Sequence, residues 1–126
     1  MSGRSLSFPQ TLLESIDEGL SVLGNEPREA LYEFLRTICS LPREDIPDHV
    51  PEFAAGLRRA LGGASKVIER LILRRLFEKT GSSFRDVPDT DFNEYVLDAK
   101  RRFEIVSHRH EDPAEGARSK KGQVSS

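Results

Sequence analysis

The chain has 126 residues, which is enough for one domain of ordinary size. Hydrophobic residues make up 37% and charged residues 32%, and 19 lysines and arginines against 21 aspartates and glutamates give a formal net charge of -2, which excludes a strongly basic, histone-like polyanion binder. The lone cysteine, Cys39, excludes an intramolecular disulfide, and no apolar run reaches the length of a signal peptide or a membrane span, so we expect a cytoplasmic protein with no membrane partner.

The first predicted helix begins after Ser7, which forms an S-x-x-Q capping pattern with Gln10, and Pro9 suits its first turn. Its apolar residues repeat at helical spacing. They predict one buried face: Leu12, Leu13, Ile16, Leu20 and Leu23. Gly24 is a typical helix stop, and Asn25 is a good N-cap for the second helix. The apolar residues of that helix fill one arc of about 140°: Ala30, Leu31, Phe34, Leu35 and Ile38.

A proline-rich connector separates the second and third helices. Its prolines forbid a continuous helix: Pro42, Pro47 and Pro51. Ile46 and Val50 are expected to anchor the connector to the core. The third helix begins at Pro51 and ends at Gly62-Gly63, which we interpret as a plain turn between helices rather than an anion-binding loop.

The fourth helix, Ala64 to Thr80, is apolar on most of its sides, and such a helix is normally central, with neighbours packed around it. One broad apolar sector contains five residues: Val67, Ile68, Leu71, Ile72 and Leu76. Leu73 and Phe77 point to nearly the opposite side.

A polar connector leads to the fifth helix, where Asp91 and Glu94 match a D-x-x-E capping box. The helix carries one apolar stripe: Phe92, Tyr95, Val96, Ala99, Phe103 and Val106. Helical periodicity ends at about Ser107. We therefore predict an all-α, compact bundle of about five helices around the central apolar helix, without strands. Residues 8–106 form the single domain, and residues 107–126 form a disordered polar tail.

No catalytic site, metal site or cofactor is predicted. His108 and His110 form an H-x-H pattern followed by acidic residues, but they lie in the predicted tail and lack a third fixed ligand. Cys39 and His49 are residue types that a thiol enzyme would use, but no third orienting group or glycine-rich oxyanion element accompanies them. We therefore expect a chain that is not an enzyme.

Basic residues recur at every fourth position of the fourth helix and give the strongest surface signal: Lys66, Arg70 and Arg74. Leu73 and Phe77 share this sector, and apolar groups among arginines favour a protein-binding patch over a nucleic-acid one. The alternative is a solvated face that Glu69 and Glu78 balance. Arg75 falls on the apolar side. It either snorkels out at the helix end or pairs with a connector carboxylate: Asp86, Asp89 or Asp91.

Four segments together resemble a known family: LLESIDEGLSVLGNEPREALYEFL, DIPDHVPEFAAGLRRALG, ASKVIERLILRRLFEKTG and DFNEYVLDAKRRF. They are similar to a small archaeal helical domain family, the Nitrosopumilus output domain type, over about Leu12 to Phe103. The resemblance implies a stand-alone or C-terminal module of signalling proteins, with no catalytic residues to transfer. No sensor or kinase segment precedes the domain here, so we expect any signalling role to act in trans.

These observations predict a non-enzymatic protein-interaction module, with a signalling output or adaptor role. Its contact surface for a protein partner, or for self-association, is the Lys66/Arg70/Arg74 ridge with Leu73 and Phe77. The alternative is a nucleic-acid-binding or transcriptional accessory protein that uses this ridge, with Gly62-Gly63 as the turn of a helix-turn-helix. Against the alternative, the candidate recognition helix is very apolar and the net charge is negative. A small-molecule-binding bundle would need a polar-lined pocket.

Overall fold

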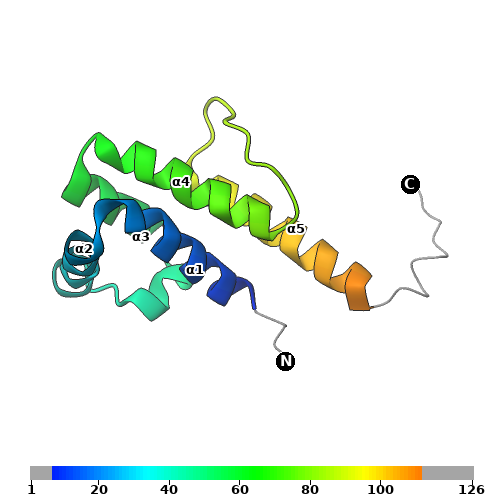
Figure 1. The fold of residues 1–126 in the computed structure, drawn as a ribbon, viewed down its shortest axis with the longest axis horizontal. Coiled ribbons are helices and arrows are strands. Elements are labelled where there is room, and N and C mark those ends of the chain that lie inside the picture. The colour runs from blue at the N-terminus through cyan, green and yellow to red at the C-terminus, as the bar shows by residue number, and fades with distance from the viewer. Residues whose placement is uncertain (1–6, 112–126) are drawn as a thin grey trace.

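The computed structural model describes residues 7–111, and the side chains of residues 7–105. The described chain forms five α-helices and two short 3-10 helices, with no strand: α1 (Phe8–Leu20), η2 (Ser21–Leu23), α2 (Asn25–Ile38), η3 (Arg43–Asp48), α3 (Val50–Leu61), α4 (Ala64–Lys79) and α5 (Phe92–Glu111). The predicted all-α class is confirmed (Figure 1). Among the described residues, no helix combines the length and the apolar character that crossing a membrane requires.

Both predicted capping boxes are present. At the start of α1, the Gln10 amide donates to Ser7 Oγ over 3.3 Å, and the Ser7 amide donates to Gln10 Oε1 over 3.3 Å. At the start of α5, the Glu94 amide donates to Asp91 Oδ1 over 2.8 Å, and the Asp91 amide donates to Glu94 Oε1 over 2.9 Å. These bonds satisfy amide groups that a helix start leaves without partners, so both helices begin where the sequence predicted.

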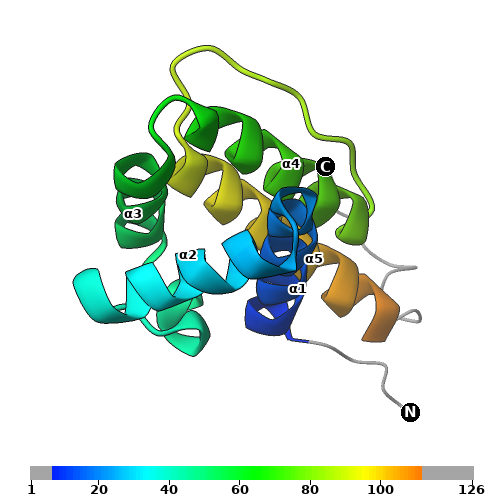
Figure 2. The same cartoon turned by 60° about the vertical axis from the view of Figure 1, so that its left-hand side comes forward.

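Helix α4 is the central element, as its composition predicted, and it contacts α1, α3 and α5 (Figure 2). Three residues of its broad apolar sector are buried: Ile68, Ile72 and Leu76. Val67 was predicted in the same sector, but 59% of it is exposed, so the sector that packs is narrower than the apolar arc.

Helix α1 lies along α4, and Gly19 brings the two backbones together. A Cβ atom at Gly19 would lie 2.5 Å from Ile72 Cγ1, and 3.1 and 3.2 Å from the backbone N and Cα of Ile72. Any larger residue would therefore push the helices apart. The sequence analysis did not predict this contact.

Helix α2 is peripheral, and only Leu31 and Leu35 of its predicted arc are fully buried. Ile38, at the end of that arc, is exposed. The N-cap of α2 is Gly24 rather than the predicted Asn25, because Gly24 adopts the positive φ of 99° that the chain needs there.

The connectors agree with the sequence at some points and differ at others. Ile46 and Val50 are buried, as predicted, although the proline-rich connector also forms η3. Gly62 and Gly63 form a turn between α3 and α4, as predicted. Helix α5 continues to Glu111, past the predicted end of helical periodicity. The rest of the predicted tail, residues 112–126, lies outside the described residues.

Candidate interaction surface

The apolar part of the predicted contact surface lies in the core. Leu73 and Phe77 are only 2% and 3% exposed, so the prediction that they form an accessible patch is wrong. The connector between α4 and α5 and helix α5 itself cover this side of α4. The ring of Phe84 meets Phe77 at 5.7 Å between centroids, and the guanidinium of Arg102 lies 5.7 Å from the Phe77 ring. The second apolar sector of α4 is thus a second packing face.

Of the two alternatives predicted for Arg75, pairing with the connector is wrong, and the exposed side chain agrees with the other, a side chain that extends outward at the helix end. Arg75 is an exposed residue whose side chain lies 4.0 Å from Glu18 of α1 and 4.0 Å from Glu78 of its own helix. The reason is that α1 packs along this side of α4, whereas the connector runs past the opposite side. The connector is instead held by Arg70, whose Nε donates to Asp86 Oδ2 over 2.8 Å.

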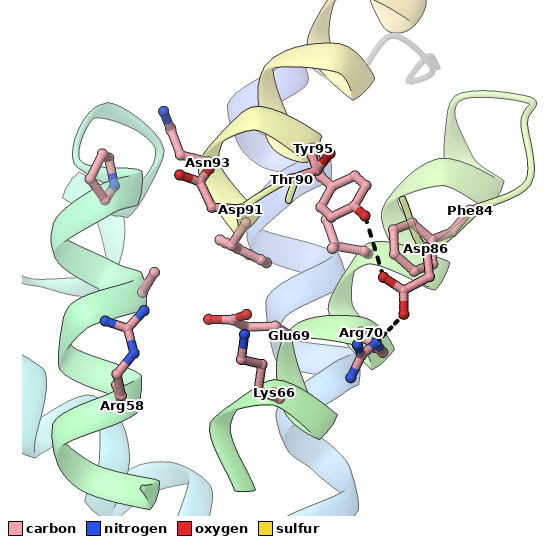
Figure 3. A pocket seen from close by; sticks show the side chains of 14 residues that line it. Arg58, Lys66, Glu69, Arg70, Phe84, Asp86, Thr90, Asp91, Asn93 and Tyr95 are labelled. Carbon is pink, nitrogen blue, oxygen red and sulfur yellow. Dashed lines mark hydrogen bonds and ion pairs between the residues drawn. The ribbon is translucent and has the colours of Figure 1, made fainter. Parts of the chain in front are cut away.

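Tyr95 of α5 fixes the same stretch of connector, as Figure 3 shows for its contact with Asp86. The Tyr95 hydroxyl accepts the Val87 amide over 2.6 Å and donates to the Val87 carbonyl over 3.0 Å. Its oxygen lies 3.4 Å from Asp86 Oδ1. The Phe84 ring packs edge-on against the Tyr95 ring, with 4.9 Å between centroids. These contacts place one wall of a cleft that is open to solvent.

This charged cleft has a volume of about 240 Å³ and lies between α3, α4, the connector and the start of α5 (Figure 3). Its charged residues are three cations and three carboxylates: Arg58, Lys66, Arg70, Glu69, Asp86 and Asp91. Leu73 forms part of its apolar lining. Two residues of the predicted basic ridge, Lys66 and Arg70, therefore line the cleft, whereas the third, Arg74, is exposed outside it.

Some charged side chains of the cleft have a hydrogen-bond or ion-pair partner, and others have none in the part of the chain that the structure describes. Asp86 accepts from Arg70, and Asp91 accepts from the first turn of α5. Among the described residues, no carboxylate lies within ion-pair distance of Arg58 or Lys66. These two cations are thus available to a group that enters the cleft.

Glu69, on α4, lines the cleft near Arg58 and Lys66 (Figure 3). Burial raises the pKa of the Glu69 carboxyl, although the nearby Lys66, Arg58 and Arg70 act in the opposite direction. Glu69 is a single half-buried carboxylate near Lys66, Arg58 and Arg70.

A second hollow, the apolar groove, shares Pro51 and Asn93 with the charged cleft. It has a volume of about 420 Å³, and its apolar lining comes from α1, η3, α3 and α5: Phe8, Pro9, Pro47, Val50, Pro51, Val96, Leu97 and Phe103. Leu97 is 48% exposed. Lys100, Glu104 and Asp48 add polar groups. No sequence pattern predicted this groove, although Leu97 stands outside the predicted buried stripe of α5.

A separate polar cluster joins α1, α2 and η3 through Asp17. Tyr32 donates its hydroxyl to Asp17 Oδ1 over 2.5 Å, and Arg43 donates Nη2 to Asp17 Oδ2 over 2.6 Å and Nε to Asp17 Oδ1 over 3.2 Å. Burial raises the pKa of the Tyr32 hydroxyl far above its usual range, and its hydrogen bond to Asp17 raises it further. Because every group here has a partner, the cluster acts as a structural link between three elements.

Cys39 and His49, the candidate residues of a thiol enzyme, do not come together in the described part of the chain. Cys39 packs against the core, while His49 is exposed beside Glu52, and within the described chain no hydrogen bond joins the two. Among residues with described placement, no group of three or more His, Cys, Asp or Glu side chains could hold a metal ion. The side chains of His108 and His110 lie outside that part of the chain.

No protein-family model, curated protein or solved structure matches this chain. The likeness to the Nitrosopumilus output domain type stays a prediction.

Proposed function

We propose that this chain is a non-enzymatic protein-interaction module, which binds a segment of a partner protein in the apolar groove. The observation that carries the proposal is the open, largely apolar groove between α1, η3, α3 and α5. A signalling output or adaptor role belongs to the same proposal and rests on the family resemblance. An adaptor of this kind acts by presenting a binding surface, and it needs no assembled catalytic groups.

The walls of the groove suit the binding of a peptide. Leu97 and Phe103 supply apolar surface on α5, and Pro47 and Pro51 supply rigid surface opposite. Apolar surface that is rimmed by polar groups is typical of protein-binding sites. Rigid walls also favour affinity, because little conformational freedom is lost when a ligand binds.

The arrangement of α4 favours a protein partner over a nucleic acid. A recognition helix presents its exposed face to a DNA groove, and the exposed face of α4 carries the apolar Val67 and the acidic Glu78 beside its cations. Arg70 of α4 pairs with Asp86. Glu69 of α4 lies near Lys66 of the same helix and Arg58 of α3. These carboxylates would repel a polyanion. Salt-sensitive binding of the chain to a DNA or RNA pool would support the nucleic-acid alternative instead.

The experiment is a selection of random peptides displayed on phage against the immobilised full chain. The enriched peptides are then synthesised, and their affinities are measured by fluorescence anisotropy. A Leu97→Asp variant is expected to lose at least about tenfold in affinity, because a carboxylate would be desolvated in the groove. Val67→Asp is the matched control, since Val67 is also an exposed apolar residue (59%, against 48% for Leu97) but lies on α4, outside the groove.

Two results would contradict the proposal. One is a selection that enriches no binding peptide, and the other is equal loss of affinity in both variants. Thermal unfolding of each variant checks that the exposed substitutions leave the fold intact.

A further inference from the structure

We infer that the partner segment is acidic as well as apolar, with its apolar residues in the groove and a carboxylate bound by Arg58 and Lys66 in the charged cleft. This inference rests on the proposed function, because it specifies the chemistry of the segment that the groove binds.

The first argument is that the two hollows adjoin. Pro51 at the start of α3 and Asn93 at the start of α5 line both the charged cleft and the apolar groove. Pro51 is exposed and Asn93 is half-buried, so a bound segment can contact both residues. An extended segment that leaves the groove over these two residues enters the cleft directly. The two hollows thus form one continuous surface, apolar at one end and charged at the other.

The second argument is the unequal engagement of charges at the charged end. Arg70 and Asp86 satisfy each other, and Asp91 caps α5. Of the three cations that line the cleft, two have no ion-pair partner among the described residues: Arg58 on α3 and Lys66 on α4, which face the cleft from two different helices. Two cations that face one hollow suit a carboxylate better than a single surface lysine would.

A basic segment and a nucleic acid both fit the charges of the cleft less well than an acidic segment does. A basic segment would meet Arg58 and Lys66, neither of which has an ion-pair partner among the described residues, so like charges would oppose it. A nucleic acid would place several phosphates near the three carboxylates of the cleft. One or two carboxylates on a peptide avoid both difficulties. Charge complementarity therefore points to an acidic segment.

The test uses the peptides selected on the full chain. The enriched sequences are expected to combine apolar residues with Asp or Glu. Arg58→Gln and Lys66→Gln are each expected to weaken binding about two- to fivefold, and the double variant about tenfold, with smaller losses at high salt. Glu69→Gln is expected to tighten binding about twofold, because it removes the competing carboxylate.

Arg74→Gln is the matched control, since Arg74 is an exposed arginine of the same helix that lies outside both hollows. Its affinity for the peptides is expected to equal that of the wild type. Enrichment of neutral or basic peptides would overturn the inference. Equal affinities of the wild type and the double variant would overturn it too.

The outcomes separate this inference from the proposed function. Peptides that need Leu97 but ignore Arg58 and Lys66 would leave the groove as a binding site and refute the acidic partner. Absence of any binding peptide would refute both. Light scattering on the full chain tests whether a second copy of the chain occupies the groove. A dimer that dissociates in Leu97→Asp would show that a second copy fills the groove, and this would also overturn the inference.

Discussion

Arg70 of α4 donates its Nε to Asp86 Oδ2 over 2.8 Å, and this contact holds the connector between α4 and α5 against the central helix. The side chains of the two residues are 45% and 56% exposed. An ion pair with this exposure is screened by water and salt, so its role is to position the connector rather than to stabilise the domain. It also removes Arg70 and Asp86 from the groups that are available in the charged cleft.

The exposure of this pair makes its energetic contribution testable. We expect Asp86→Asn to lower the free energy of unfolding by about 0.2–1 kcal/mol, as is usual for exposed pairs. Urea unfolding of the wild type, Asp86→Asn, Arg70→Gln and the double variant gives the coupling energy. Arg85→Gln serves as the control, because Arg85 lies exposed in the same connector and has no ion pair among the described residues. A coupling energy above about 2 kcal/mol would contradict this description.

Leu73 is expected to behave as a core residue and not as a contact residue. Leu73→Ala removes buried methyl groups and leaves a cavity, so we expect a loss of about 2–5 kcal/mol in the free energy of unfolding. Val67→Ala, on the exposed side of the same helix, is expected to change it by less than about 0.5 kcal/mol. Chemical denaturation measures both variants. Similar values for the two would mean that the second sector of α4 is open.

Gly19 is expected to tolerate no side chain at the contact of α1 with α4. Alanine favours helices by about 1 kcal/mol over glycine, but its Cβ would meet the Ile72 backbone, which cannot rotate away. We therefore expect Gly19→Ala to destabilise the domain by about 1–3 kcal/mol. Gly63→Ala is the control, because Gly63 has a φ of -63° and no atom within 4 Å of an added Cβ. A more stable Gly19→Ala chain would refute the close approach of the two helices.

The hydrogen bond of Tyr32 to Asp17 predicts a loss of stability at alkaline pH. The pKa of Tyr32 is raised in the folded chain, so above its unfolded pKa of about 10 the unfolded chain releases a proton that the folded chain retains. The stabilisation is complete below that pH, and it is lost as pH rises towards the folded pKa. We expect the free energy of unfolding to fall more steeply in the wild type than in Tyr32→Phe.

Ultraviolet absorbance of ionised tyrosine gives an independent check on Tyr32. While both chains remain folded, the wild type and Tyr32→Phe are expected to show the same tyrosinate absorbance near pH ~10, because Tyr32 stays protonated. Extra absorbance in the folded wild type at that pH would show that the Tyr32 hydroxyl titrates normally.

The parts of the fold that depend on neighbours in sequence were predictable. Both capping boxes, Ser7 with Gln10 and Asp91 with Glu94, need only residues three apart and form as predicted. The anchoring of Ile46 also followed from an apolar residue among prolines and charges. In both capping boxes the deciding interaction lies within one turn of chain.

The remaining features depend on which element lies beside which. Helical angle placed Leu73 and Phe77 opposite the main core, but it could not show that the connector and α5 cover that side. The position of Arg75 around the helix also suggested a pairing with the connector, which Arg70 makes instead. The angle of a residue around its own helix gives no information about which other elements pack beside it. The apolar groove combines four separate elements, so no local pattern indicated it.

The burial of α4 on two opposite sides has a consequence for biosynthesis. When the ribosome has released α1 to α4, the Leu73 and Phe77 side of α4 still lacks α5, which is made after it. The nascent chain at that stage carries a bare apolar face on its central helix, and such faces favour aggregation. Folding is therefore completed only once α5 emerges, and a ribosome that stalls within the connector would leave a product that chaperones recognise and proteases degrade.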